Sequence, residues 1–226
     1  MKIAFIVILG LLLTSSSYAA LHTEMVAYKD GEVELEGFLT YDDAREGKVP
    51  GVLVFHEWKG LNEYAKKRAA MLAELGYVAF AADMYGKGIK AETHEEAAKL
   101  SSIYKQDRSL MRNRAKAALD FLASHERVNP DRVAAIGYCF GGTTVLEMAR
   151  AGFGVKGVVS FHGAVDTPTP AQPGDIKAKV LVFHGADDEF VNAHVPAFME
   201  EMKKSGADWQ FVSFGGAIHS FTVPEA

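Results

Sequence analysis

The residue best suited to chemistry is Cys139, the only cysteine of the chain. It lies in the stretch 137–142, Gly-Tyr-Cys-Phe-Gly-Gly, between an apolar run at 133–136 and a helical pattern at 143–151. A buried strand, a tight turn with a nucleophile at its apex and a helix form the Gly-x-Ser-x-Gly nucleophile elbow, here with cysteine in place of serine. The glycines would avoid clashes with the neighbouring strand and helix, and the helix N-terminus favours a thiolate. The alternative is a buried structural cysteine.

An acid and a base follow Cys139 along the chain, each after a predicted strand. Asp187-Asp188 follows the run 180–183, and His219 lies in a glycine-rich loop after 209–214. The order nucleophile, acid, histidine predicts a triad in which His219 is the general base and an aspartate orients it. Asp188 is preferred because it leads into the next helix, and Asp187 is the rival. The alternatives without a catalytic role are an exposed loop histidine and a helix-capping or solvated aspartate.

Three further groups are candidates near the thiol. Glu57 ends the buried run 50–55, where its carboxylate would act on the thiol proton, although a surface glutamate is the alternative. The backbone N–H groups of Trp58 and Phe140 are the predicted oxyanion hole, since such a hole uses the residue after the nucleophile and a loop after an earlier strand. The side chains of Trp58 and Tyr85 would line the site or pack in the core.

The histidine pattern predicts no metal and no cofactor. His56-Glu57 lacks the second histidine of a His-Glu-x-x-His helix, because lysine and glycine stand at 59 and 60. His162, His184 and His194 have ordinary interpretations as strand-end or helix residues. No glycine-rich phosphate loop is present, and the run 137–142 does not match a dinucleotide-binding fingerprint.

The first residues predict a secretory signal peptide at 1–19. Lys2 supplies a positive start, residues 3–13 are apolar, and Ser17 and Ala19 precede a predicted cleavage after Ala19. A retained N-terminal anchor is the alternative. We therefore expect a periplasmic or secreted protein, in an oxidising compartment where cysteines usually pair. A lone cysteine there is expected to be buried or used.

The remainder, 20–226, predicts a single domain. The chain has 226 residues, 49% hydrophobic and 23% charged, and its net charge of −5 gives no reason to expect nucleic acid or a membrane surface as partner after cleavage. Strand-like runs alternate with helical segments, which indicates an α/β, doubly wound and mostly parallel sheet in a three-layer sandwich. Residues 25–28 and 33–41 predict an N-terminal antiparallel hairpin, with 33–41 as an edge strand. The other predicted strands are 50–55, 77–82, 133–136, 155–161, 180–183 and 209–214, and a turn at 129–131 precedes the strand 133–136. The predicted helices are 64–75, 107–124, 143–151 and 192–205, with a looser helical excursion at 87–103.

Five motifs follow one another along the chain: His56-Glu57 with Gly60-Leu61-Asn62, Asp83-Met84-Tyr85-Gly86, the run 137–142, Asp188-Glu189-Phe190-Val191 and Ala217-Ile218-His219-Ser220-Phe221. In these motifs and their order, the sequence resembles the dienelactone hydrolase family, carboxymethylenebutenolidase-like members of the α/β-hydrolase superfamily, from about residue 25 to the end. The resemblance implies the triad Cys139, His219 and Asp188, and a thiol that Glu57 keeps protonated until substrate displaces the glutamate. It also implies hydrolysis of lactones and activated esters through an acyl-cysteine.

The chain departs from this family at the residues that bind a carboxylate. Members that act on dienelactone carry arginines where this chain has Lys87 and Val223; lysine offers charge without a bidentate fork, and valine offers neither. This and the export signal argue for a substrate other than dienelactone, with Tyr85 and Lys87 as predicted substrate-binding residues. Family members usually continue into a further helix beyond the position of Ala226, which predicts a truncated or unusual end.

We therefore predict an exported cysteine hydrolase of small lactones or activated carboxylic esters, with a small molecule as its binding partner. A protein of the same fold that binds a ligand or partner without catalysis is the alternative. A thiol redox protein is a third possibility, but it would need a resolving cysteine from a partner.

Overall fold

The computed structural model describes residues 21–224, so the predicted signal peptide, its cleavage site and the chain end at 225–226 lie outside the described residues. The described part folds around one eight-stranded sheet. The strands are β1 (Leu21–Asp30), β2 (Val33–Asp42), β3 (Val49–Phe55), β4 (Val78–Ala82), β5 (Val128–Tyr138), β6 (Gly157–Phe161), β7 (Lys179–Gly185) and β8 (Trp209–Phe214). The helices are α1 (Glu63–Glu74), α2 (His94–Gln106), α3 (Arg108–Ser124), α4 (Phe140–Arg150) and α5 (Val195–Ser205), and a 3-10 turn (Asn192–His194) precedes α5.

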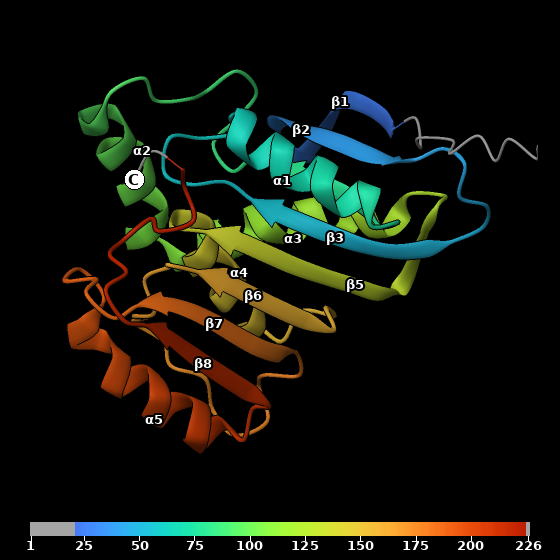
Figure 1. The fold of residues 1–226 in the computed structure, drawn as a ribbon. Helices are drawn as coiled ribbons and strands as arrows, with labels where there is room; N and C mark the ends of the chain where they lie inside the picture. The colour runs from blue at the N-terminus through green and yellow to red at the C-terminus, as the bar shows by residue number, and fades with distance from the viewer. Residues whose placement is uncertain (1–20, 225–226) are drawn as a thin grey trace, which may run out of the picture.

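The sheet is parallel except at its N-terminal end. Its strand order is β1-β2-β4-β3-β5-β6-β7-β8 (Figure 1). The pairs from β4 to β8 are parallel, whereas β1 with β2 and β2 with β4 are antiparallel. The predicted α/β class, the mostly parallel sheet and the N-terminal hairpin are thereby confirmed. Because the parallel strands point the same way, their carboxyl ends meet at one edge of the sheet, where α2 and the C-terminal segment also lie (Figure 1).

The prediction that residues 33–41 form an edge strand is wrong. β2 lies between β1 and β4, and its residues Phe38 to Thr40 pair with Ala79 to Ala81. β1 occupies the edge instead. The alternating pattern of β2 reports one buried and one wetter face, and any antiparallel strand with one covered face has this pattern, whether or not a second strand pairs with it.

The turn predicted at 129–131 lies inside β5. β5 pairs with β3 as Pro50 opposite Asn129 and then Gly51 opposite Val133, so residues 130–132 have no partner in β3. Pro130 lacks the N–H that a regular ladder requires, and a bulge is one of the few places where a strand tolerates proline. The turn residues therefore interrupt the pairing without ending the strand.

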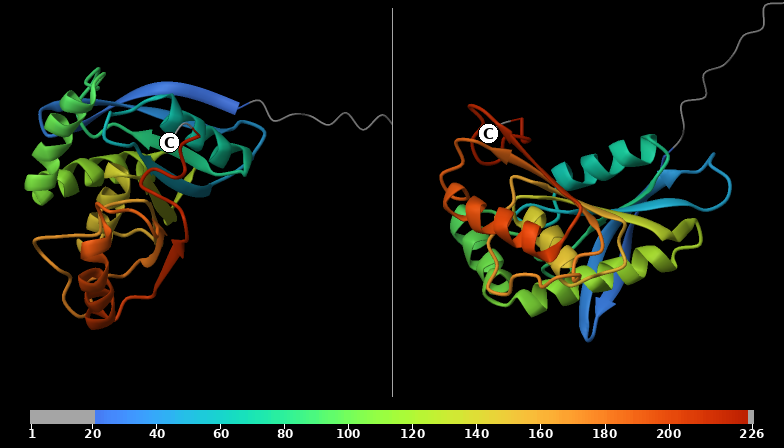
Figure 2. Two further views of the ribbon diagram at one scale, coloured as in Figure 1. Left: turned by 60° about the vertical axis from the view of Figure 1, so that its left-hand side comes forward. Right: turned by 90° about the horizontal axis from the view of Figure 1, so that it is seen from below.

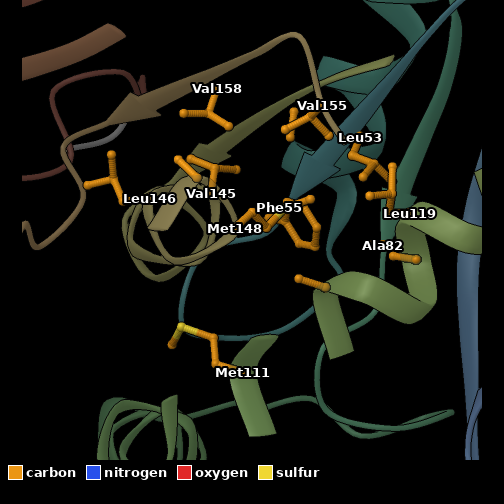
Figure 3. Packing of buried hydrophobic residues seen from close by; sticks show 14 of the residues in the cluster. Leu53, Phe55, Ala82, Met111, Leu119, Val145, Leu146, Met148, Val155 and Val158 are labelled. Carbon is orange, nitrogen blue, oxygen red and sulfur yellow. The ribbon is translucent and has the colours of Figure 1, made fainter. Parts of the chain in front are cut away.

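Helices cover both faces of the sheet, which gives the predicted three layers. α1 lies on one face and α3, α4 and α5 on the other (Figures 1 and 2). Every residue of α4 is buried, because this helix lies between the sheet and α3. Figure 3 shows Val145 and Met148 of α4 close to Phe55 and Val158 of the sheet. The nucleophile turn thus leads directly into the most buried helix of the molecule.

The excursion predicted at 87–103 is a loop followed by α2. Thr93 caps α2, accepting a hydrogen bond from the Glu96 N–H while the Glu96 side chain accepts from the Thr93 N–H. The helix therefore begins at His94, later than the predicted excursion, and extends to Gln106. Among the helices of residues 21–224, none combines the length and apolar character needed to cross a membrane.

Candidate active site

Cys139 lies at the apex of a strained turn between β5 and α4. Its backbone has φ 51° and ψ −110°, a conformation that residues other than glycine rarely adopt. A Cβ atom on Gly137 would lie 2.0 Å from the Gly141 carbonyl oxygen, and one on Gly141 would lie 2.2 Å from the Phe55 carbonyl oxygen. Both positions therefore require glycine, as the sequence predicts, because helix and strands approach here at backbone contact.

A thiol, an imidazole and a carboxylate lie in line above this turn. The Cys139 Sγ is 3.2 Å from His219 Nε2, and His219 Nδ1 is 2.7 Å from Asp188 Oδ2. Asp188 is buried, and its other oxygen accepts a hydrogen bond from the Phe190 N–H. Asp187 instead uses its backbone N–H to bond the Ala217 carbonyl. Of the two candidate aspartates, the structure brings Asp188 to His219.

Burial and charge keep the thiol protonated. Burial raises the pKa of Cys139 to about 12, and the charge of Glu57 adds to this effect. The N–H groups of Phe140 and Trp58 and the charge of Lys105 lower the same pKa by less. The thiolate that the helix N-terminus favours is therefore not the resting form, because burial outweighs the helix dipole. The result agrees with the protonated thiol that the family resemblance implies.

Glu57 lies beside the thiol in a site with few polar partners. Its side chain is 14% exposed, and within residues 21–224 its Oε1 atom has no hydrogen-bond partner. Burial raises the pKa of Glu57, and the nearby His219 opposes that shift. Its backbone is held by His56, whose Nε2 accepts a hydrogen bond from the Met84 N–H and whose Nδ1–H donates to the Glu57 carbonyl. The backbone of Glu57 is thus held in place, whereas Oε1 of its carboxylate is not held by a hydrogen bond within residues 21–224.

The two predicted oxyanion donors act on the sulfur. The N–H groups of Phe140 and Trp58 both favour a negative charge there, because both lower the pKa of the Cys139 thiol. Tyr85 is buried, and its hydroxyl donates to the Trp58 carbonyl at 2.8 Å. Tyr85 therefore supports the loop of Trp58 from behind.

The two predicted substrate-binding residues do not line the cavity above Cys139. Tyr85 lies behind Trp58, and Lys87 pairs with Glu36 at 3.3 Å. Both predictions need this correction, because the Tyr85 ring packs in the core and the Lys87 side chain turns to β2 of the hairpin. The cavity is closed on that side by α2, whose sequence carries no recognisable functional motif.

The cavity has a volume of about 690 Å³ and opens onto Cys139 and His219. Its wall is mainly apolar, and Trp58 stacks on His94 with their ring centroids 5.3 Å apart. Two cations reach it. Arg108 is paired with Asp166 at 3.2 Å, whereas Lys105 has no ion pair among the described residues. The lining residues are Trp58, His94, Ser102, Lys105, Gln106, Arg108, Cys139, Phe140, Thr143, Ala164, Asp166, Phe190, Val191, His219 and Ser220.

The other histidines of residues 21–224 do not belong to a cluster that could hold a metal ion. In the part of the chain that the structure describes, no group of three or more His, Cys, Asp or Glu side chains is arranged to hold a metal ion. His184 bonds Asn192, as expected of a strand-end residue. His162, predicted as equally ordinary, lies beneath the turn, and its Nδ1 atom accepts a hydrogen bond from the Cys139 N–H. Its place after β6, the neighbour of β5, was the signal that sequence reasoning passed over.

The sheet order, the strained cysteine turn and the later aspartate and histidine define the α/β-hydrolase superfamily. A family model described as the dienelactone hydrolase family matches residues 35–226, and the chain belongs to that family. It is therefore a hydrolase that acts on carboxylic esters or lactones.

Several relatives agree with this assignment. The chain is 30% identical over 205 residues to a putative carboxymethylenebutenolidase of Aquifex aeolicus, covering 88% of this chain and 86% of the relative. It is 28% identical over 155 residues to the carboxymethylenebutenolidase of Pseudomonas sp. strain P51, covering 65% and 63%. A solved dienelactone hydrolase-like promiscuous phosphotriesterase from metagenomic libraries is 41% identical, with a TM-score of 0.84 over 92% of this chain and 87% of that one.

A more distant solved structure shows the fold alone. Porphyromonas gingivalis dipeptidyl peptidase 4 is 17% identical, with a TM-score of 0.70 over 90% of this chain and 33% of the peptidase. The same sheet and helices therefore support different reactions, and the chemistry of this chain must be argued from its own site.

Proposed function

We propose that the protein is an exported cysteine hydrolase of small lactones or activated carboxylic esters. The observation that carries the proposal is the line of contacts from Cys139 Sγ through His219 to Asp188, at 3.2 and 2.7 Å. The N–H groups of Trp58 and Phe140 beside the sulfur support it. These parts supply a nucleophile, a base, an orienting acid and donors for an oxyanion, which together suit acyl transfer.

In the first half-reaction, the substrate carbonyl oxygen accepts from the N–H groups of Trp58 and Phe140. Substrate that displaces Glu57 removes the negative charge that holds the thiol proton, and His219 Nε2 takes this proton. The sulfur then attacks the carbonyl carbon, and Asp188 stabilises the imidazolium. When the tetrahedral intermediate collapses, the carbon–oxygen bond breaks, and the leaving alkoxide takes the proton from His219. An acyl-Cys139 thioester remains.

In the second half-reaction, water replaces the alcohol. His219 accepts a proton from this water, and the resulting hydroxide attacks the thioester carbonyl. The carbon–sulfur bond breaks, and the sulfur takes back the proton from His219 as the carboxylic acid leaves. For a lactone, both products are one hydroxy acid, because the alkoxide and the acyl group belong to the same molecule.

Acylation of Cys139 tests this function against a binding protein without catalysis. The purified protein is mixed with p-nitrophenyl acetate, quenched in acid and digested for mass spectrometry. We expect an acetyl group on the peptide that holds Cys139, together with release of p-nitrophenolate in excess of the protein. Turnover without acylation contradicts the cysteine mechanism, and the absence of both favours the binding protein. Because a solved relative is named as a phosphotriesterase, a phosphotriester belongs in the same substrate panel.

We also propose that the preferred esters carry an anionic group at a distance from the reacting carbonyl. Lys105 is the cation of the cavity that has no ion pair among the described residues, whereas Lys87 is engaged by Glu36. Replacing Lys105 with methionine should raise KM for the p-nitrophenyl monoester of succinic acid about five- to tenfold, because an exposed charge contact contributes about 1 kcal/mol. KM for the neutral acetate ester should not change. Lys99→Met, also on α2 but outside the cavity lining, is the matched control.

Export is the remaining part of the proposal, and it rests on Lys2, the apolar run 3–13 and the small residues before Ala20. Expression of the full chain in a bacterial host should give a periplasmic protein whose first residue is Ala20. N-terminal sequencing of the periplasmic fraction measures this, and an uncleaved protein in the membrane fraction would support the retained anchor.

A further inference from the structure

His162 is a buried histidine that the proposed mechanism does not use. It follows β6 directly beneath the nucleophile turn, is 0% exposed and has a left-handed backbone with φ 42°. Cys139 also has a positive φ, of 51°. Two residues other than glycine in this conformation, in contact with one another, indicate a local arrangement that the surroundings must enforce.

One nitrogen of His162 holds the backbone of the nucleophile. The Cys139 N–H donates to His162 Nδ1 at 3.1 Å and to the Phe161 carbonyl at 3.0 Å. The N–H is thus shared between two acceptors, and the imidazole supplies the one that does not belong to the sheet. Because Nδ1 accepts, the proton of the neutral ring is on Nε2.

The other nitrogen of His162 holds the loop that carries His219. Its Nε2–H donates to the hydroxyl oxygen of Thr222, three residues after His219, with the nitrogen and the oxygen 2.8 Å apart. Thr222 is itself tied to α1, because its carbonyl accepts from Tyr64 and Arg68, each at 3.1 Å. The ring of His162 also meets the ring of His219 edge to face, with centroids 5.5 Å apart. A continuous set of contacts therefore joins α1, the His219 loop and the Cys139 backbone.

The structure assigns to His162 the role of a positioning residue that sets the distance between the Cys139 sulfur and His219. One rigid imidazole contacts both partners, which come from segments 80 residues apart in the chain. A bond at Nδ1 fixes the turn that presents the sulfur, and the bond at Nε2 fixes the loop that presents the base. This inference rests on the proposed function, since it explains how the nucleophile and its base stay at 3.2 Å.

Charged groups around His162 are compatible with a neutral ring. Glu57 Oε1 lies 4.0 Å from Nε2, and His219 and Arg68 face the ring from the loop and from α1. Burial, with a contribution from His219, lowers the pKa of His162 to about 3. A ring that stays neutral does not form an ion pair with Glu57, which leaves that carboxylate to act on the thiol.

Substitutions can separate the two contacts of His162. His162→Leu removes both. His162→Asn places an amide oxygen near the position of Nδ1 and accepts the left-handed backbone, so it retains the contact to Cys139. Thr222→Val keeps the side-chain shape and the contact at Nδ1 but removes the contact at Nε2, together with the 2.8 Å contact between the hydroxyls of Thr222 and Tyr64. His184→Leu is the matched control, because His184 is also buried at a strand end but does not contact Cys139.

The readouts are kcat and KM for p-nitrophenyl acetate, the rate of Cys139 alkylation by iodoacetamide from pH 6 to 10, and urea unfolding. We expect His162→Leu to lower kcat about tenfold to a hundredfold with KM within about twofold, since misplacement near 1 Å has costs of this order. His162→Asn should recover most of that loss. Thr222→Val should lower kcat less, and its effect should be smaller in the His162→Leu background than in the wild type, because both changes break the contact at Nε2. His184→Leu should lower stability while leaving kcat of the folded protein unchanged.

Three results would overturn the inference: an unchanged kcat in His162→Leu, additive effects of His162→Leu and Thr222→Val, or an equal loss of kcat in His184→Leu. The alkylation profile separates this inference from the proposed function, because alkylation of Cys139 does not require ester hydrolysis. If wild-type protein hydrolyses no ester, the proposed function fails. A shift of the alkylation profile that His162→Leu and Thr222→Val share, and His184→Leu lacks, would still support the positioning role.

Discussion

Replacing Cys139 with alanine should lower kcat/KM for p-nitrophenyl acetate by about ten-thousandfold or more, while the protein stays folded. The variant keeps the oxyanion donors and the cavity but has no atom that can form the acyl-enzyme, and loss of a nucleophile has effects of this size in comparable triads. The fold should tolerate the change, because the sulfur makes its polar contact with His219 and alanine leaves the turn glycines in place. Steady-state kinetics and urea unfolding measure the two quantities.

A double variant makes this prediction sharper. His219→Ala alone should cost nearly as much as Cys139→Ala, and the two together should cost no more than Cys139→Ala alone, because a nucleophile and its base act as one unit. Asp188→Asn should cost less than either, since it leaves the base present but poorly oriented. Hydrolysis that survives in Cys139→Ala at a tenth of the wild-type rate or more would contradict the proposed nucleophile and would direct attention to another group in the cavity.

Replacing Glu57 with glutamine should raise the rate at which iodoacetamide alkylates Cys139 at neutral pH by about tenfold, because a larger fraction of the thiol is then ionised. Only the thiolate reacts, and the negative charge of Glu57 raises the pKa of this thiol. Removing that charge lowers the thiol pKa, so at a given pH more thiolate is present. Burial, the larger cause of the raised pKa, remains in the variant, so reactivity should still increase with pH beyond neutrality.

The dependence of the alkylation rate on pH shows the direction in which Glu57 shifts the thiol pKa. With a thiol pKa of about 12, wild-type alkylation should rise steadily from pH 6 to 10 without reaching a plateau, and the Glu57→Gln profile should shift to lower pH. Glu63→Gln is the matched control, because Glu63 is a surface carboxylate at the start of α1, with its side chain 88% exposed and paired with Lys66. Equal rates in wild type and Glu57→Gln would contradict the control of the thiol by Glu57.

A protonated resting thiol has a consequence for an exported protein. Oxidation of cysteine follows thiolate character and exposure, and Cys139 combines a raised pKa with partial burial. The proposed export would expose the chain to an oxidising compartment, where its single cysteine has no partner for an internal disulfide. Glu57→Gln should therefore also lose activity faster during storage in air, as the more ionised thiol is oxidised.

The sequence by itself determined the local structure around the nucleophile and the order of the reacting groups. The pattern of apolar strand, glycine-flanked cysteine and helix specifies the turn, because residues that are neighbours in the chain decide it. Gly137 and Gly141 are needed at contacts of backbone with backbone, which are the same for any chain with this turn. The pair Asp187-Asp188 and His219 follow from the rule that parallel strands bring their carboxyl ends together, whereas the contact of His219 with Asp188 is a feature of the fold.

Only the tertiary structure decided which side chains surround the thiol and what state it is in. Lys105 lines the cavity because α2 packs over the turn, whereas Lys87 does not line it and instead pairs with Glu36 of the hairpin. His162 contacts Cys139 because β6 pairs with β5. The thiol pKa depends on burial, and burial depends on every segment that packs around the site. Chain neighbours set a turn, whereas a cavity and its electrostatics arise from segments that are distant in sequence.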